Sequence, residues 1–126
     1  MSENRTILLV DDDTAVRHAL SIFLNTSGYN VRTYASAEAY LDDVEGGTEG
    51  VMLLDLRMPG MSGLELQSEL TRRGINIPII FLSGHSDAEM SVMAIKAGAI
   101  GFLEKPFGNG DLLATIREAF SVADDN

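Results

Sequence analysis

The chain has 126 residues, of which 45% are hydrophobic and 22% charged, a composition typical of one ordinary globular domain. It contains no cysteine, which excludes disulfides and thiolate metal sites, and no apolar run of the length that a membrane-spanning helix needs. Its 19 acidic and 9 basic residues give a net charge of −10, which argues against direct binding of nucleic acid. We therefore expect a single cytoplasmic domain over residues 1–126 that contacts neither membrane nor nucleic acid.

The first half of the chain alternates between apolar runs and stretches of helical period. Residues 7–10 form a continuous apolar run, which is typical of a strand buried on both faces. The helical stretch that follows is expected to end at Ser27-Gly28, because glycine readily adopts the left-handed conformation found at helix ends. Residues 30–34 alternate as in a half-exposed edge strand, and a second helix is expected to end near Gly46-Gly47. The inward positions of these two helices are Val16, Ala19, Leu20, Phe23 and Leu24, then Ala37, Tyr40, Leu41 and Val44.

The second half repeats this alternation. Further strands are predicted over residues 51–54, 77–82 and 100–103, and further helices over about 62–73, over about 87–97 and near the C-terminus. The inward residues of the last two helices are expected to be Met90, Met93, Ala94 and Ala97, then Leu112, Leu113, Ile116 and Phe120. Five strand–helix pairs predict an α/β fold with a doubly wound parallel sheet of order 2-1-3-4-5. Such folds place their sites at the C-terminal ends of the strands.

Polar residues follow four of the predicted strands. Asp11 and Asp12 follow the first, Asp55 the third and Ser83 the fourth, while Lys105, one of only two lysines, comes shortly after the fifth. Carboxylates suit Mg²⁺, and a lysine and a hydroxyl beside them would bind phosphoryl oxygens. An aspartate in that setting is a candidate nucleophile. Each residue alone is more typical of a turn or a helix cap, so the prediction depends on their convergence.

Four blocks of this sequence resemble the receiver domain of two-component response regulators. They are Val10-Asp11-Asp12, the stretch LDLRMPGMSG at 54–63, Leu82-Ser83-Gly84 and Glu104-Lys105-Pro106-Phe107. The resemblance spans about residues 5–122 and is greatest to receivers of nitrogen-fixation regulators, which precede helix-turn-helix DNA-binding domains. It implies a flavodoxin-like, CheY-like fold. We expect residues 1–126 to carry the receiver without an output domain, either as a single-domain regulator or as a receiver excised from a longer one.

The resemblance also implies a phosphoacceptor regulator rather than an enzyme, one that assists its own phosphorylation and slow dephosphorylation. Asp55 would accept a phosphoryl group from a sensor histidine kinase. Mg²⁺ would be bound directly by Asp12, Asp55 and the backbone carbonyl of Arg57, with Asp11 acting mainly through a water molecule. Lys105 would pair with Asp55 before phosphorylation and with the phosphoryl group afterwards.

Further residues take switch roles by the same resemblance. Ser83 would turn its hydroxyl to the phosphoryl group, and Phe102 would become more buried, changing the face formed by the fourth helix, the fifth strand and the fifth helix. From the sequence pattern alone Phe102 is a plain core residue, so both interpretations stay open. Arg57 and His85 would either shield or assist the attacking water, or be exposed loop residues. The family further implies homodimer formation on phosphorylation and a cis Lys105-Pro106 bond.

Two other classes of protein fit part of the sequence. A phosphatase with its nucleophile on the first strand would use Asp11 in the pattern Asp-x-Asp-x-Thr/Val, but Ala15 occupies the fifth position. A pseudo-receiver, which binds partners without phosphorylation, usually lacks the acceptor, an acidic residue or the lysine, and all of these are present here.

Asp13, the last of three consecutive aspartates, has no place in the metal site. We expect it to cap the first helix and to favour the positive N-terminal end of the helix, an effect of about 0.5–2 kcal/mol. His18 lies on the polar side of the same helix and is expected to be exposed.

Overall fold

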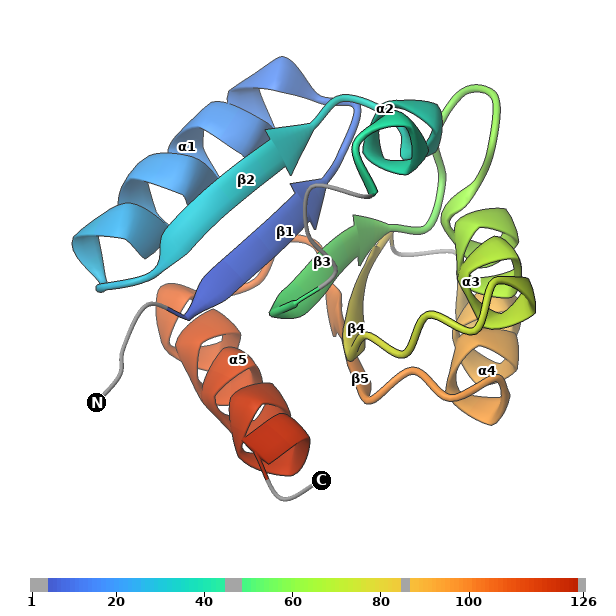
Figure 1. The fold of residues 1–126 in the computed structure, drawn as a ribbon. Helices are drawn as coiled ribbons and strands as arrows, with labels where there is room; N and C mark the ends of the chain where they lie inside the picture. Colours follow the sequence, from blue (N-terminus) through green and yellow to red (C-terminus); the bar gives the residue numbers. More distant parts are fainter. Residues whose placement is uncertain (1–4, 45–48, 85–86, 125–126) are drawn as a thin grey trace.

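The computed structural model describes residues 5–44, 49–84 and 87–124, and within them five strands alternate with five helices (Figure 1). All neighbouring strands are parallel, in the order β2-β1-β3-β4-β5, which confirms the predicted fold class and strand order. The strands are β1 (Thr6–Val10), β2 (Asn30–Tyr34), β3 (Val51–Asp55), β4 (Ile79–Ser83) and β5 (Gly101–Glu104). The helices are α1 (Thr14–Thr26), α2 (Ala37–Asp42), α3 (Gly63–Arg72), α4 (Ala88–Lys96) and α5 (Asn109–Asp124).

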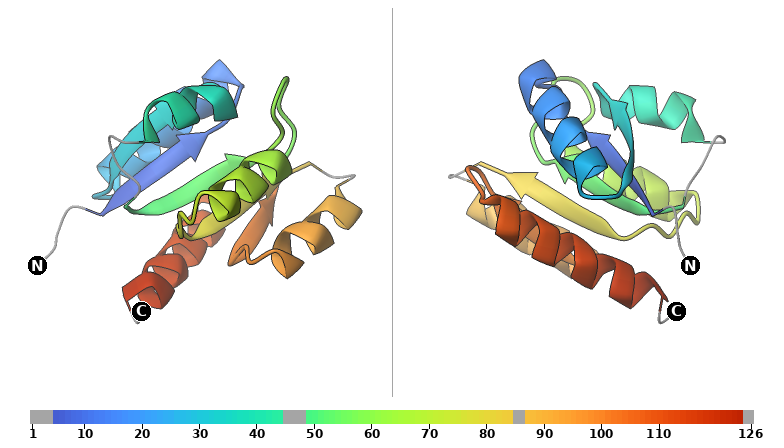
Figure 2. Two further views of the ribbon diagram at one scale, coloured as in Figure 1. Left: turned by 45° about the vertical axis from the view of Figure 1, so that its right-hand side comes forward. Right: turned by 90° about the vertical axis from the view of Figure 1, so that its left-hand side faces the viewer.

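Helices cover both faces of the sheet, so the molecule has three layers (Figure 2). Ile7 and Leu9 of β1 pack in one apolar cluster with residues of α1 and α5, whereas Leu8 and Val10 pack in a second cluster with α2, α3 and α4. Successive side chains of a strand point to opposite faces, and here both faces are buried. This explains why the apolar run of β1 is continuous rather than alternating.

Glycines end two helices where the sequence predicts that they end. Gly28 follows α1 with φ of 103°, and Gly74 follows α3 with φ of 74°. No heavy atom lies within 4 Å of a Cβ built at either position, so a side chain there would be opposed by backbone strain and not by a clash. The predicted end of the second helix, at Gly46-Gly47, lies outside the described residues.

The inward face of α4 differs from the prediction. Ala94 is fully buried and Met90 is partly buried, but Met93 is 59% exposed and Ala97 is also exposed. Ser91 is buried instead, so the buried face of α4 contains a small polar residue and not Met93. A search for apolar periodicity cannot find such a face.

No helix in the described part of the chain combines the length and apolar character that crossing a bilayer requires.

Candidate functional site

Three carboxylates meet at the C-terminal edge of the sheet, as the strand order predicts. Val10 of β1 is in register with Leu54 of β3, so Asp11 and Asp55, the next residues of each chain segment, are neighbours. One carboxylate oxygen each of Asp11, Asp12 and Asp55 lies within 4.8 Å of the others. Asp11 is fully buried and Asp55 is 8% exposed, while Asp12 is exposed. Two carboxylates of the cluster are therefore buried, and solvent reaches it at the third, Asp12.

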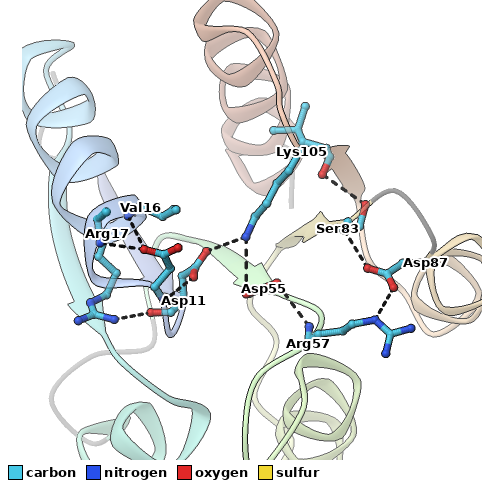
Figure 3. A network of polar contacts seen from close by, with 12 residues as sticks. Asp11, Val16, Arg17, Asp55, Arg57, Ser83, Asp87 and Lys105 are labelled. Atoms are coloured by element: carbon cyan, nitrogen blue, oxygen red, sulfur yellow. Dashed lines mark hydrogen bonds and ion pairs between the residues drawn. The ribbon is translucent and has the colours of Figure 1, made fainter.

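Lys105 places its ammonium group against this cluster (Figure 3). Its Nζ lies 3.2 Å from Oδ2 of Asp11 and 3.6 Å from Oδ2 of Asp55. Its backbone N–H donates to the carbonyl of Ser83 at 2.8 Å, which anchors the lysine to the end of β4. The following Lys105-Pro106 bond is cis, as the family resemblance predicts. The 3.6 Å distance between Lys105 Nζ and Asp55 Oδ2 is the ion pair that the resemblance implies for the unphosphorylated protein.

The two partners of this ion pair have shifted pKa values. Burial, reinforced by the nearby charge of Asp11, raises the pKa of Asp55 to about 6, although Lys105 and the Arg57 N–H oppose the rise. Burial alone would lower the pKa of Lys105, but the carboxylates of Asp55 and Asp11 outweigh it, so that pKa is raised. The three carboxylates of the cluster thus outnumber the one lysine that pairs with them.

The donor set of the cluster fits a hard divalent cation. Three carboxylates with uncompensated charge offer the oxygen ligands that Mg²⁺ prefers, and Mg²⁺ commonly completes its coordination with water. The N–H of Arg57 points to Oδ1 of Asp55 at 3.4 Å, so the backbone of Arg57 borders the cluster. Coordination by the carbonyl of Arg57 remains a prediction.

Ser83 and Phe102 lie on the side of the site that faces α4. Ser83 is 2% exposed, and its Oγ donates to the carbonyl of Leu103 at 3.4 Å, a long hydrogen bond to the neighbouring strand β5. Phe102 is 45% exposed, so its interpretation as a core residue of β5 is wrong. Both residues line an open groove between α4 and β5, together with Ser91, Val92 and Ile95.

The sequence gives no sign of a further ion pair, between Arg57 and Asp87. Arg57 Nε donates to Oδ1 of Asp87, and this bond lowers the pKa of the Asp87 carboxyl although the burial of that carboxyl opposes the shift. The two residues are 30 positions apart, and neither lies in a pattern that points to the other. Asp87 is recognisable in the sequence only as the start of a helix.

The remaining polar residues near the site behave largely as expected. Oδ1 of Asp13 accepts hydrogen bonds from the N–H groups of Ala15 at 2.9 Å and Val16 at 3.2 Å, which confirms its role as the cap of α1. His18 is exposed, as predicted. His85 lies outside the described residues. Arg17 was not anticipated: its Nη1 donates to the carbonyl of Asp11 at 2.7 Å and so braces the first aspartate of the cluster.

An acidic cluster with a single paired lysine, at the edge of a doubly wound five-stranded sheet, is the architecture that the family resemblance predicts. Over residues 7–117 the sequence matches the response regulator receiver domain family. The chain belongs to that family.

Individual relatives agree with this assignment. The chain is 50% identical over 121 residues to the response regulator protein TmoT of Ectopseudomonas mendocina, with 96% of this chain and 55% of that protein covered. It is 46% identical over 124 residues to the response regulator protein TodT of Pseudomonas putida, covering 98% and 55% of the two chains. The crystal structure of FixJ-N superposes with a TM-score of 0.87 at 42% identity and 94% coverage of both chains. The chain spans about half the length of the curated relatives it matches.

Proposed function

We propose that this chain is the phosphorylation-dependent switch of a cytoplasmic two-component phosphorelay, with Asp55 as the residue that accepts the phosphoryl group. The observation that carries the proposal is the position of the Asp55 carboxylate, within 4.8 Å of two other carboxylates and 3.6 Å from the Lys105 ammonium. A carboxylate so placed lies beside groups that can balance the charge of a phosphoryl group.

The chemistry is phosphoryl transfer from a phosphohistidine of a sensor kinase. An oxygen of Asp55 attacks the phosphorus, a P–O bond forms as the P–N bond breaks, and the electron pair of that bond stays on the imidazole, which takes up a proton. Lys105 holds the incoming phosphoryl oxygens after leaving its pairing with Asp55. Mg²⁺, bound by Asp12, Asp55 and the Arg57 carbonyl and through water by Asp11, would supply further charge neutralisation at those oxygens.

The response to phosphorylation starts at Ser83. Its hydroxyl exchanges the 3.4 Å hydrogen bond to Leu103 for one to a phosphoryl oxygen, which is a stronger acceptor because it is charged. Phe102 then moves from its 45% exposed position into the groove beside Ser83. This changes the face formed by α4, β5 and α5, a two-state element that a local charge change can bias.

Transfer from a small phosphodonor tests this function directly. Incubation with acetyl phosphate and Mg²⁺ should add one phosphoryl group to the intact protein, and Asp55→Asn should prevent the addition, as read by mass spectrometry. Labelling that survives in Asp55→Asn but is lost in Asp11→Asn would favour the phosphatase class with its nucleophile on β1. A chain that is never labelled would favour a pseudo-receiver.

The wider role follows from the relatives, some of which are named response regulator proteins and others transcriptional regulatory proteins. We propose that phosphorylation controls an output domain or a partner protein, and that phosphorylated chains form homodimers. Any binding of DNA would then belong to the output domain, because this chain has a net charge of −10.

A further inference from the structure

The Arg57–Asp87 ion pair joins the loop after β3 to the start of α4 (Figure 3). The two partners differ in their surroundings: the side chain of Asp87 is 2% exposed, and that of Arg57 is 63% exposed. Asp87 is therefore the fixed member of the pair, while the arginine can leave through solvent without disturbing the core.

Asp87 is held in place from several sides. Its Oδ2 accepts the N–H of Gly84 at 2.8 Å, and its carbonyl accepts the N–H of Ser91 at 2.9 Å. It occupies the N-cap position of α4, where an aspartate normally accepts hydrogen bonds from the first turn, yet its side chain makes no such bond. Its two carboxylate oxygens are used for Gly84 and Arg57 instead.

Arg57 lies close to the acceptor as well as to Asp87. It follows Asp55 by two residues, and its backbone N–H points to Oδ1 of Asp55. A phosphoryl group carries about two negative charges and matches the forked donors of a guanidinium, whereas Asp87 offers one charge to a single nitrogen. A phosphoryl group on Asp55 is thus a stronger partner for this side chain than Asp87 is.

We propose that Asp87 is a positioning residue, which holds the Arg57 side chain away from Asp55 in the unphosphorylated protein and gives it up to the phosphoryl group. The exchange removes one connection between the β3 loop and α4. It is therefore a second route from Asp55 to α4, separate from Ser83 and Phe102. This inference rests on the proposed function of Asp55.

Binding of beryllofluoride in the presence of Mg²⁺, as a mimic of the phosphoryl group, tests the exchange. Asp87→Asn keeps the size of the side chain and an oxygen for the Gly84 N–H but removes the charge that holds Arg57. It should tighten beryllofluoride binding about fivefold, the effect of one partly exposed ion pair. In a chain that also carries Arg57→Gln, the same substitution should have no effect. Arg72→Gln, which removes another exposed, ion-paired arginine, is the matched control and should leave binding unchanged.

Three results would overturn the proposal. One is a binding affinity that is unchanged or weaker in Asp87→Asn. Another is an equal tightening with and without Arg57, because Asp87 would then act through its charge alone. The third is read in the wild-type protein, without any variant: the NMR signal of the Arg57 Nε–H should shift on addition of beryllofluoride, and a signal that stays in place contradicts the exchange.

The same measurements separate this inference from the proposed function. A wild-type chain that binds beryllofluoride and is phosphorylated by acetyl phosphate, but leaves the Arg57 signal unmoved, overturns the exchange alone. A wild-type chain that binds no beryllofluoride and takes no phosphoryl group overturns both.

Discussion

The C-terminal edge of the sheet has two halves that differ in how deeply their residues are buried. We call the part around β1 and β3 the firm half and the part around α4 and β5 the loose half. Around β1 and β3 the strand residues are almost completely buried, and α1 begins with a side-chain cap from Asp13. Around α4 and β5, Val92, Ile95 and Phe102 are 54%, 43% and 45% exposed, and α4 has no side-chain cap. The carboxylates proposed to carry the chemistry thus stand on the firm half, and Phe102, which is expected to move, belongs to the loose half. Few buried contacts are the physical mark of a region that rearranges at low cost.

The largest expected effect is on the firm half. Asp12→Ala should weaken Mg²⁺ binding by about 100-fold or more, because it removes one of three clustered carboxylates, and should abolish Mg²⁺-dependent phosphorylation. Calorimetric titration with Mg²⁺ measures the first effect, and mass spectrometry after acetyl phosphate treatment the second. Asp12 is exposed, so the free energy of unfolding should change little. Mg²⁺ binding that survives the substitution would move the metal site elsewhere.

A pair of substitutions of apolar residues, one in each half, compares the halves directly. Leu54→Ala removes a fully buried side chain of β3 and should lower the free energy of unfolding by about 2–5 kcal/mol. Phe102→Ala, at a position that is 45% exposed, should cost less than about 1 kcal/mol. Urea denaturation of both variants gives the two values. Similar costs would contradict the contrast between a firm and a loose half.

The raised pKa of Asp55 predicts how stability depends on pH when no metal is present. Between pH 4 and about 6 the folded protein keeps the proton on Asp55, because its pKa is raised to about 6, while the unfolded chain has largely lost it. The free energy of unfolding should therefore fall by about 2 kcal/mol as the pH rises through this range. Urea denaturation in EDTA across that range measures the change. Asp55→Asn should remove this part of the pH dependence, and an unaltered profile in that variant would assign it to another group.

The smallest effect concerns the cap of α1. Asp13→Ala should lower the free energy of unfolding by about 1 kcal/mol, because it removes both hydrogen bonds to the first turn. Phosphorylation by acetyl phosphate should remain largely intact. Loss of phosphorylation in this variant would show that all three consecutive aspartates serve the site.

Much of this molecule could be predicted from its sequence, for identifiable reasons. The continuous run at 7–10 reports a strand buried on both faces, and the strand order follows from five strand–helix repeats, so the meeting of Asp11, Asp55 and Lys105 could be anticipated. The receiver family was recognisable from four short blocks around these residues.

The features that the sequence did not predict lie around α4 and β5, where few side chains are buried. Met93 faces solvent while Ser91 is buried, and Phe102 is exposed although it lies on a strand. The Arg57–Asp87 pair joins the loop after β3 to the start of α4 through side chains alone. Apolar periodicity describes elements that bury a wide stripe, and α4 and β5 bury little. Sequence patterns were therefore least informative in the half of the molecule that is expected to change.

The residues of the site lie far apart in the sequence, and this determines when the site can form during synthesis of the chain. Lys105 pairs with a carboxylate 94 residues earlier, and the parallel sheet that brings them together consists of long-range contacts, which form slowly. A chain still emerging from the ribosome has its aspartates long before it has its lysine. We therefore expect phosphoacceptor competence to be acquired only with completed folding, so that a half-made chain cannot pass on a signal.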